Sequence, residues 1–312
     1  MEHKEYKFEI VTPLIMSGTD KNNLELRTQS IKGILRWWYR FINGGIKDLN
    51  QLKIDEADIF GSQEKASKIK LKINDIPEQT TQAYLCMNDN RSINDNSNKV
   101  KKHYNKICKN AYDVDNSFTL AVLFENKNII EEFENILFFI NYFGGLGSRW
   151  RRGFGSVKIN NSNNQNLFEY NFKSFEELSE YLKNKINLLN HNNNLSFTNL
   201  SNSDLFVIKP ENKNWQSWEN AMNDLRGNFY REFKNRIQKR SIGNFNPRQP
   251  SPLIIQIKKA KISNEIKYYG IIISSYNNKD SNNKLKNDFY TKSEFIDFIN
   301  SLKTYNLISD IK

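Results

Sequence analysis

The chain has 312 residues, of which 38% are hydrophobic and 13% aromatic, so it holds enough apolar material for two domains of ordinary size. No apolar run approaches the roughly 18 residues that span a bilayer, and the N-terminus lacks the apolar stretch of a signal peptide, so we expect a cytoplasmic protein without membrane contact. The net charge of +11 favours a polyanionic partner such as nucleic acid, although a generally basic surface is the alternative.

The first half of the chain shows strand and helix periodicities in the order βαββαβ. This order is typical of a ferredoxin-like unit, in which two helices pack on one face of an antiparallel sheet and the other face is free for a ligand. The predicted elements are a strand at 6–11, a helix at 30–42, strands at 68–73 and 118–124, a helix at 129–142 and a strand at 156–159.

The second half repeats this order less clearly. We therefore expect an α+β protein with tandem ferredoxin-like (RRM-like) domains at 1–160 and 204–312. Asn-rich stretches around a short predicted helix at 174–189 indicate a linker at 161–203. The predicted elements of the second half are a strand at 205–208, a helix at 217–238, strands at 253–258 and 268–274, a helix at 293–302 and a last strand near Leu307.

The segment FGGLGSRWRRGFGS, which begins at Phe143, is the densest candidate site. Glycines let successive backbone N–H groups point into one anion-binding concavity, and arginines add bidentate phosphate contacts. Trp150 and Phe154 offer flat faces on which a base could stack. The alternative is a helix cap followed by a turn, with solvated arginines. The candidate RNA-binding residues are Gly144, Gly145, Gly147, Arg149, Trp150, Arg151, Arg152 and Gly153.

The predicted helix at 30–42 carries a second candidate surface. Lys32, Arg36 and Arg40 recur at four-residue steps and form a basic stripe beside the apolar face. Ser30 suits the N-cap position, where a free helix N-terminus could also receive a phosphate. A solvated basic face is the competing interpretation.

Two further residues of this helix bear on the same surface. Gly33 costs helix stability, on the order of 1 kcal/mol against alanine, which indicates a close backbone approach or a tolerated glycine. Trp37 is either the edge of the core or a platform for a base. The helix therefore joins the candidate site through its exposed side.

Other candidates for chemistry are weaker. Glu56 and Asp58 form an acidic pair that could bind a metal, but an acidic pair just before a turn is more typical of surface charge. Arg248, in a proline-punctuated loop, either contacts RNA or is simply exposed. Cys86 and Cys108 form no CxxC pair, and the three histidines lie far apart, so we expect no metal and no cofactor.

Four segments, TPLIMSGTD, RTQSIKGILRWWYRF, EADIFGS and GGLGSRWRRGFGS, follow one another in this order. As a set they resemble the RAMP superfamily of CRISPR effector proteins, and within it the first-numbered subunit of the type III-B Cmr complex. The resemblance implies a tandem ferredoxin-like fold and a place near the 3′ end of the guide RNA, where target RNA is captured. It also implies a binding subunit, with RNA cleavage carried out by a different subunit.

The hypothesis is that the glycine-arginine loop and the basic stripe form one groove for guide RNA or target RNA, beside other RAMP subunits of a Cmr complex. The rival is a metal-independent endoribonuclease that processes guide RNA by general acid/base attack of a 2′-hydroxyl, for which His103 and Tyr104 are the candidates. A scaffold that docks only protein is a third possibility.

Overall fold

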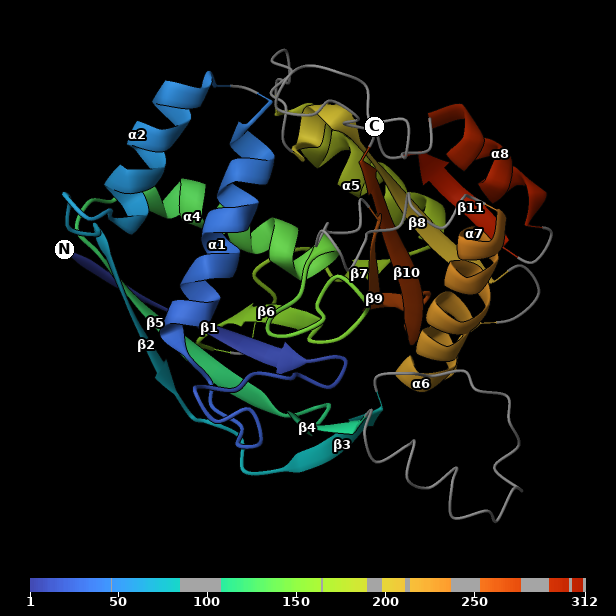
Figure 1. The fold of residues 1–312 in the computed structure, drawn as a ribbon, viewed down its shortest axis with the longest axis horizontal. Coiled ribbons are helices and arrows are strands. Elements are labelled where there is room, and N and C mark those ends of the chain that lie inside the picture. The colour runs from blue at the N-terminus through green and yellow to red at the C-terminus, as the bar shows by residue number, and fades with distance from the viewer. Residues whose placement is uncertain are drawn as a thin grey trace.

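The computed structural model describes residues 1–45, 47–84, 108–163, 165–189, 198–210, 214–236, 253–275, 292–302 and 305–310. These residues form a four-stranded and a five-stranded sheet, each packed against helices, together with a two-stranded hairpin (Figure 1). All the strand pairs are antiparallel except one short pair at the edge of the larger sheet. The predicted α+β class with antiparallel sheets is confirmed.

The smaller sheet comes from the first half of the chain and has the order β2-β5-β1-β6. Side chains alternate along its central strand, so Tyr6, Phe8 and Ile10 face the helices and are buried. The strands are β1 (Glu2–Ile10), β2 (Ile69–Asn74), β5 (Ser117–Phe124) and β6 (Val157–Asn161).

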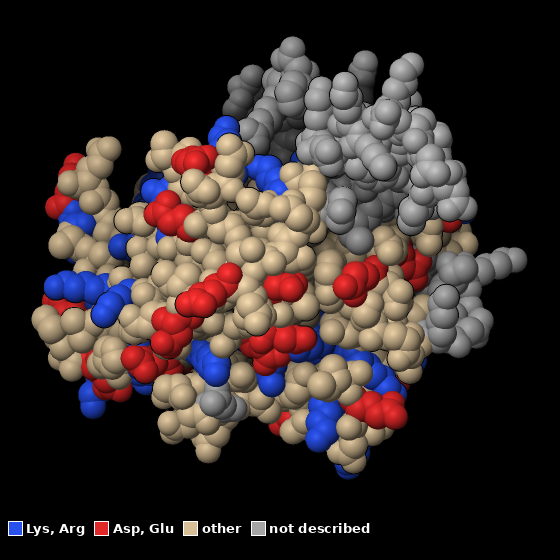
Figure 2. Space-filling model, turned by 90° about the horizontal axis from the view of Figure 1, so that it is seen from below, with Lys and Arg blue, Asp and Glu red and all other residues tan. Residues whose placement is uncertain are grey.

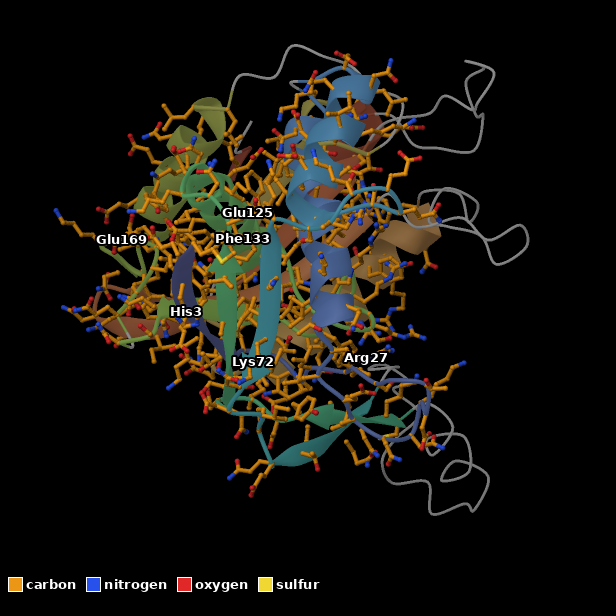
Figure 3. The ribbon with its side chains drawn as sticks, turned by 90° about the vertical axis from the view of Figure 1, so that its left-hand side faces the viewer. His3, Arg27, Lys72, Glu125, Phe133 and Glu169 are labelled. Atoms are coloured by element: carbon orange, nitrogen blue, oxygen red, sulfur yellow. The ribbon has the colours of Figure 1, made fainter. Side chains whose placement is uncertain are left out.

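Two helices cover the inner face of this sheet, α1 (Thr28–Asn43) and α4 (Asn128–Phe143). Phe133, labelled in Figure 3, lies on α4. Its ring centroid is 5.7 Å from that of Tyr6 and 5.2 Å from that of Phe124. Offset and edge contacts of this kind add to the burial of apolar area. The buried faces of both helices therefore form the first core with this sheet.

Three elements of the first half were not predicted: α2 (Leu49–Phe60) and the hairpin of β3 (Thr80–Tyr84) with β4 (Cys108–Tyr112). Asp48 begins α2, because its carboxylate accepts hydrogen bonds from the amides of Asn50 and Gln51. In Figure 1, α2 stands beside α1, while the hairpin lies at the opposite end of the first half.

The larger sheet has the order β11-β8-β10-β9-β7 and is buried on both faces. One face packs on α5 and the first half, and the other packs on α6, α7 and α8. Its strands are β7 (Asn171–Phe172), β8 (Ser203–Pro210), β9 (Leu253–Ile262), β10 (Glu265–Ser275) and β11 (Tyr305–Asp310). The helices are α5 (Phe175–Asn187), α6 (Trp218–Met222), α7 (Tyr230–Arg236) and α8 (Lys292–Ser301).

The helix predicted at 217–238 is present, but its middle is wider than an α-helix. A π-helical segment, Asn223–Phe229, joins α6 to α7. Such segments are rare and often lie at functional sites. This one carries Arg226, whose guanidinium lies 5.0 Å from the ring centroid of Phe154 in the first half.

The region predicted as a linker contains the expected short helix, α5, which begins at the N-cap Ser174. It does more than connect the two halves. Phe175, Leu178 and Leu182 of α5 are buried in the core, and β7 pairs in parallel with β9. Part of 161–203 therefore packs with the second sheet.

No helix within the described ranges is long and apolar enough to cross a membrane. Seen from below, basic and acidic side chains alternate over the described surface, without one block of positive charge (Figure 2). The net charge therefore does not by itself mark a binding face on this side, so a candidate RNA-binding surface has to be identified from individual residues.

Candidate nucleic-acid interface

The glycine-arginine loop, residues 143–156, connects α4 to β6 and lies between the two halves (Figure 1). Hydrogen bonds within the loop and to residues 13–15 hold its base in place. The amide of Leu146 donates to the carbonyl oxygen of Gly155 at 2.8 Å, that of Ser148 to Ile15 at 2.6 Å, and that of Gly155 to Pro13 at 3.0 Å. These amides are consumed inside the protein, so they do not form the predicted anion-binding concavity.

Two glycines at the base are explained by these close approaches. Gly147 has φ of 76° and Gly155 has φ of 64°, in the left-handed region that favours glycine. A Cβ atom would overlap the carbonyl oxygen of Ile15 at Gly147 and that of Leu146 at Gly155. These glycines serve the packing of the loop rather than contact with a ligand.

The tip of the loop, residues 149–151, is different. Arg149 is exposed, has φ of 60°, and forms no ion pair with any described residue. In the part of the chain that the structure describes, the amides of Arg149, Trp150 and Arg151 donate no hydrogen bond to a backbone oxygen. Successive free amides beside a left-handed residue can bind an anion. These three amides of the tip therefore remain available for the predicted anion binding.

Trp150 does not offer an open face, contrary to the sequence-based prediction. It is 8% exposed, and its ring packs edge-on against Trp37 at 5.0 Å. The guanidinium of Arg151 lies 5.0 Å from the ring centroid of Trp37 and 5.4 Å from that of Trp150. Burial lowers the pKa of Arg151, and no carboxylate among the described residues pairs with it. A cation–π contact therefore orients an arginine that has no anionic partner.

Arg152 points to the other half of the molecule. Its guanidinium lies 4.3 Å from the ring centroid of Tyr230 on α7, and one nitrogen, Nη1, is buried without a hydrogen-bond partner among the described residues. Burial lowers the pKa of Arg152, while Tyr230 acts in the opposite direction. Phe154 is 1% exposed, so the prediction that it offers a face to a base is wrong.

Strand β9 of the second half fixes the loop from behind. The amide of Ile255 donates to the carbonyl oxygen of Arg151 at 3.1 Å, and the side-chain amide of Gln256 donates to that of Trp150. The buried amine of Lys258 donates to Ile140 at 2.8 Å and Gly144 at 2.6 Å. Sequence reasoning missed these residues; the available signal was a Gln and a Lys within the apolar strand LIIQIKKA.

The remaining glycines of the loop face the protein interior. A Cβ at Gly144 would lie 2.6 Å from Nε1 of Trp38, and one at Gly145 would lie 2.8 Å from Nε2 of Gln256. Gly153 has φ of 87° and approaches Met222 on α6. The structure therefore buries most of the glycines that surround the arginines of the loop.

The basic stripe of α1 faces the segment from α2 to β2. Nζ of Lys32 donates to the hydroxyl of Ser67 at 2.9 Å. Arg36 and Arg40 both donate to Oε1 of Glu56, at 2.6 and 2.9 Å. Their side chains remain 35% and 42% exposed, so they are paired but still accessible.

The start of α1 differs from the prediction. The helix begins at Thr28, so Ser30 lies inside the first turn, and Arg27 is the N-cap residue, with no side-chain cap. Ser30 as N-cap is therefore wrong, because the helix extends two residues further towards the N-terminus. Figure 3 shows Arg27 at this end of α1. Gly33 is exposed, and no atom lies within 4 Å of a Cβ built on it, so no contact within the described protein explains a glycine here.

The two carboxylates of the acidic pair both bind basic side chains. Glu56 is 5% exposed and binds two arginines, so its interpretation as surface charge is wrong, and Asp58 pairs with Lys65 and Lys68. Among the residues the structure describes, no group of three or more His, Cys, Asp or Glu side chains could hold a metal ion. Two further sets of predictions, those for Arg248 and for the rival pair at 103–104, lie outside the described residues.

Comparison with known proteins agrees with the sequence motifs: a model of the RAMP superfamily matches residues 7–158. These residues are a RAMP superfamily domain. Two relatives from Pyrococcus furiosus are the CRISPR system Cmr subunits Cmr1-2 and Cmr1-1. The first is 27% identical over 178 residues, which are 49% of this chain and 93% of the relative. The second is 24% identical over 235 residues, 68% of each chain.

Solved structures show that the likeness extends beyond the RAMP domain. The crystal structure of apo Cmr1 from Pyrococcus furiosus aligns over 100% of both chains with a TM-score of 0.62 at 22% identity. A chain of the type III-B Cmr-beta complex bound to cognate target RNA covers 88% of this chain and 95% of its own, with a TM-score of 0.50 at 14% identity. At these identities the likeness shows the fold. The whole chain therefore has a Cmr1-like fold.

Proposed function

We propose that this chain is a non-catalytic RNA-binding subunit of a type III-B CRISPR Cmr complex. In that complex it contacts the 3′ region of the guide RNA, captures target RNA, or does both, and it neighbours other RAMP subunits. Arg149 and Arg151 carry the proposal, because they lie at the tip of one loop without a carboxylate partner among the described residues. An arginine without an anionic partner is ready to bind a phosphate.

The chemistry of the tip favours the RNA backbone over the bases. Guanidinium and amide N–H groups both donate to phosphate oxygens, and such contacts carry no sequence information. Trp150 is packed under Trp37, so the contribution of stacking on its ring is small. We therefore expect binding with slight sequence preference.

The fold supports the same proposal. In each sheet the first and third strands of the unit are central neighbours and the second and fourth lie outside them, as in a ferredoxin-like βαββαβ unit. We take the chain as a tandem of two such units, with α5 and β7 added to the second. The complex of the Cmr-beta relative is bound to target RNA, which agrees with RNA as the partner.

A catalytic role has less support. A metal-independent endoribonuclease needs an acid and a base within hydrogen-bond reach of the reacting ribose. The side chains at the loop tip are arginines and a packed tryptophan, which suit binding of charge rather than proton transfer. Labelled repeat RNA incubated with the protein, with and without a chelator, should remain intact. Products that disappear in the His103→Ala variant would favour the endoribonuclease.

Fluorescence anisotropy of a labelled single-stranded RNA tests the binding directly. The wild-type protein should bind at low salt, and the double variant Arg149→Ala/Arg151→Ala should bind at least about tenfold more weakly. Circular dichroism of both proteins controls for folding. Equal affinity of the two folded proteins would contradict the proposal, and no binding by either would favour a scaffold that docks only protein.

A further inference from the structure

The carboxylate of Glu56 holds two arginines of α1 at once. Its Oε1 lies 2.6 Å from Nε of Arg36 and 2.9 Å from Nη1 of Arg40, and Nη1 of Arg36 also donates to the carbonyl oxygen of Gly61 at 3.2 Å. Glu56 is 5% exposed, whereas the two arginine side chains are 35% and 42% exposed. The carboxylate is therefore beneath the arginines, and the arginines lie between it and the solvent.

Several donors of this pair remain available. A guanidinium has five N–H donors, and each contact with Glu56 uses one of them. Nη2 of Arg36 and both Nε and Nη2 of Arg40 make no hydrogen bond to any described residue. Two arginines against one glutamate leave a net charge of about +1 at this surface.

The same side of α1 has an open strip. Because a helix turns about 100° per residue, Gly33 lies about 20° from Arg40 and about 40° from Trp37 around the axis. No atom of the described residues lies within 4 Å of a Cβ at Gly33, so the backbone is accessible there as far as the described chain is concerned. Trp37, on the far border of the strip, carries the guanidinium of Arg151. Arginines therefore flank the strip on both sides.

We propose that Glu56 is a positioning residue that presents Arg36 and Arg40 to an RNA phosphate passing over Gly33. The inference rests on the proposed RNA-binding function and specifies a second contact beside the loop tip. A carboxylate that fixes two long side chains before binding reduces the conformational entropy that they lose on contact with phosphate. Glu56 does not touch the RNA.

Removing the negative charge of Glu56 distinguishes a positioning role from a purely electrostatic one, because the two predict opposite changes in RNA affinity. Glu56→Gln removes a negative charge, so a diffuse field would predict tighter RNA binding. Positioning predicts the opposite, because the released arginines must be ordered by the RNA. Glu134→Gln is the matched control, since Glu134 also accepts from two side chains, Lys4 at 2.9 Å and Tyr6 at 3.0 Å, on another part of the first half.

The experiment measures RNA affinity by anisotropy and melting temperature by circular dichroism. We expect Glu56→Gln to bind about fivefold more weakly than Glu134→Gln, a factor within ordinary coupling energies. In an Arg36→Ala/Arg40→Ala background, Glu56→Gln should cause no further loss of affinity. The inference is overturned if Glu56→Gln binds RNA as tightly as Glu134→Gln or more tightly. It is also overturned if Glu56→Gln causes the same loss of affinity in the Arg36→Ala/Arg40→Ala background as in the wild type.

A second variant covers the case in which Glu56→Gln does not fold. Arg40→Lys keeps the charge and its attraction to Glu56 but loses the planar fork, so we expect weaker RNA binding with an unchanged melting temperature. Unchanged affinity overturns the inference. Failure of the proposed function is distinguishable, because then the wild type does not bind RNA or the Arg149→Ala/Arg151→Ala variant binds equally well.

Discussion

The guanidinium of Arg152 lies 4.3 Å from the ring centroid of Tyr230, which connects the glycine-arginine loop of the first half to helix α7 of the second. Its neighbour Arg151 lies instead over Trp37 on α1. Adjacent arginines of one loop thus contact opposite halves of the molecule. Arg152 thus contacts the second half, Arg151 packs on the tryptophans of the first half, and Arg149 is exposed.

Arg152→Ala should lower the free energy of unfolding by about 1 kcal/mol, the size of a partly buried cation–π contact. Arg149→Ala should change it by less than about 0.5 kcal/mol, because Arg149 is exposed. Urea denaturation followed by tryptophan fluorescence measures both. Tyr230→Phe keeps the ring but loses the hydroxyl that hydrogen-bonds Arg152, so its stability should lie between those of the wild type and Tyr230→Leu, and Tyr230→Leu should resemble Arg152→Ala. Equal stabilities for all four variants would refute a junction contact.

Glycine substitutions should act in opposite directions at the loop base and on α1. Gly147→Ala and Gly155→Ala force a Cβ onto a backbone oxygen at a positive φ, so each should destabilise the protein by about 2 kcal/mol or more. Gly33→Ala places its methyl group in open space and should stabilise the helix by up to about 1 kcal/mol.

Thermal unfolding measures the change in stability of these three variants. The RNA affinity of Gly33→Ala is a second, independent measurement. If RNA passes over this strip of α1, Gly33→Ala should raise the melting temperature and weaken binding. Tighter or equal binding by the stabilised variant would mean that Gly33 is only a tolerated glycine.

Most helices and strands could be predicted from the sequence because their apolar periodicity is strong. Helix α2 was missed for a specific reason. Its buried row is Leu52, Glu56, Ile59 and Phe60, so a glutamate occupies a position that an apolar residue normally fills. Glu56, which interrupts the apolar pattern of α2, is also the residue that binds the arginines of α1. The basic stripe could be predicted locally, but its partner could not.

The loop shows a second limit of sequence reasoning. Its composition correctly marked an unusual connection, yet the direction of each arginine depends on α1 and α7, which are far away in the sequence. The hydrogen bonds that Gln256 and Lys258 donate to the loop and the end of α4 likewise join residues that are far apart in the sequence. Non-local packing therefore decides which of the glycines and arginines face outward.

Lys258 should make stability depend on pH. Burial lowers the pKa of its amine well below the ordinary lysine value, so between the two values the unfolded chain binds more protons than the folded chain. The free energy of unfolding of the wild type, relative to Lys258→Met, should therefore rise with pH across that window, by at most about 1.4 kcal/mol per pH unit.

Urea denaturation of wild type and Lys258→Met over a series of pH values isolates this contribution, since other titrating groups are common to both proteins. The variant should also be less stable by about 1–3 kcal/mol, because the carbonyl oxygen of Gly144 loses the Lys258 donor and that of Ile140 keeps only the amide of Gly144. A difference that does not change with pH across that window would mean that the amine is charged in the folded protein and would contradict the prediction.

The salt dependence of RNA binding should separate the arginines of the tip from the rest of the basic surface. For single-stranded nucleic acid, each lost phosphate contact reduces the slope of log affinity against log salt by about 0.7. Arg149→Ala and Arg151→Ala should each flatten the slope by this amount. Arg236 is a matched control, because it is half-exposed on α7 and contacts Glu232 and Ser301 away from the loop. Arg236→Ala should leave the slope unchanged, and an equal flattening in all three variants would indicate diffuse charge rather than a site.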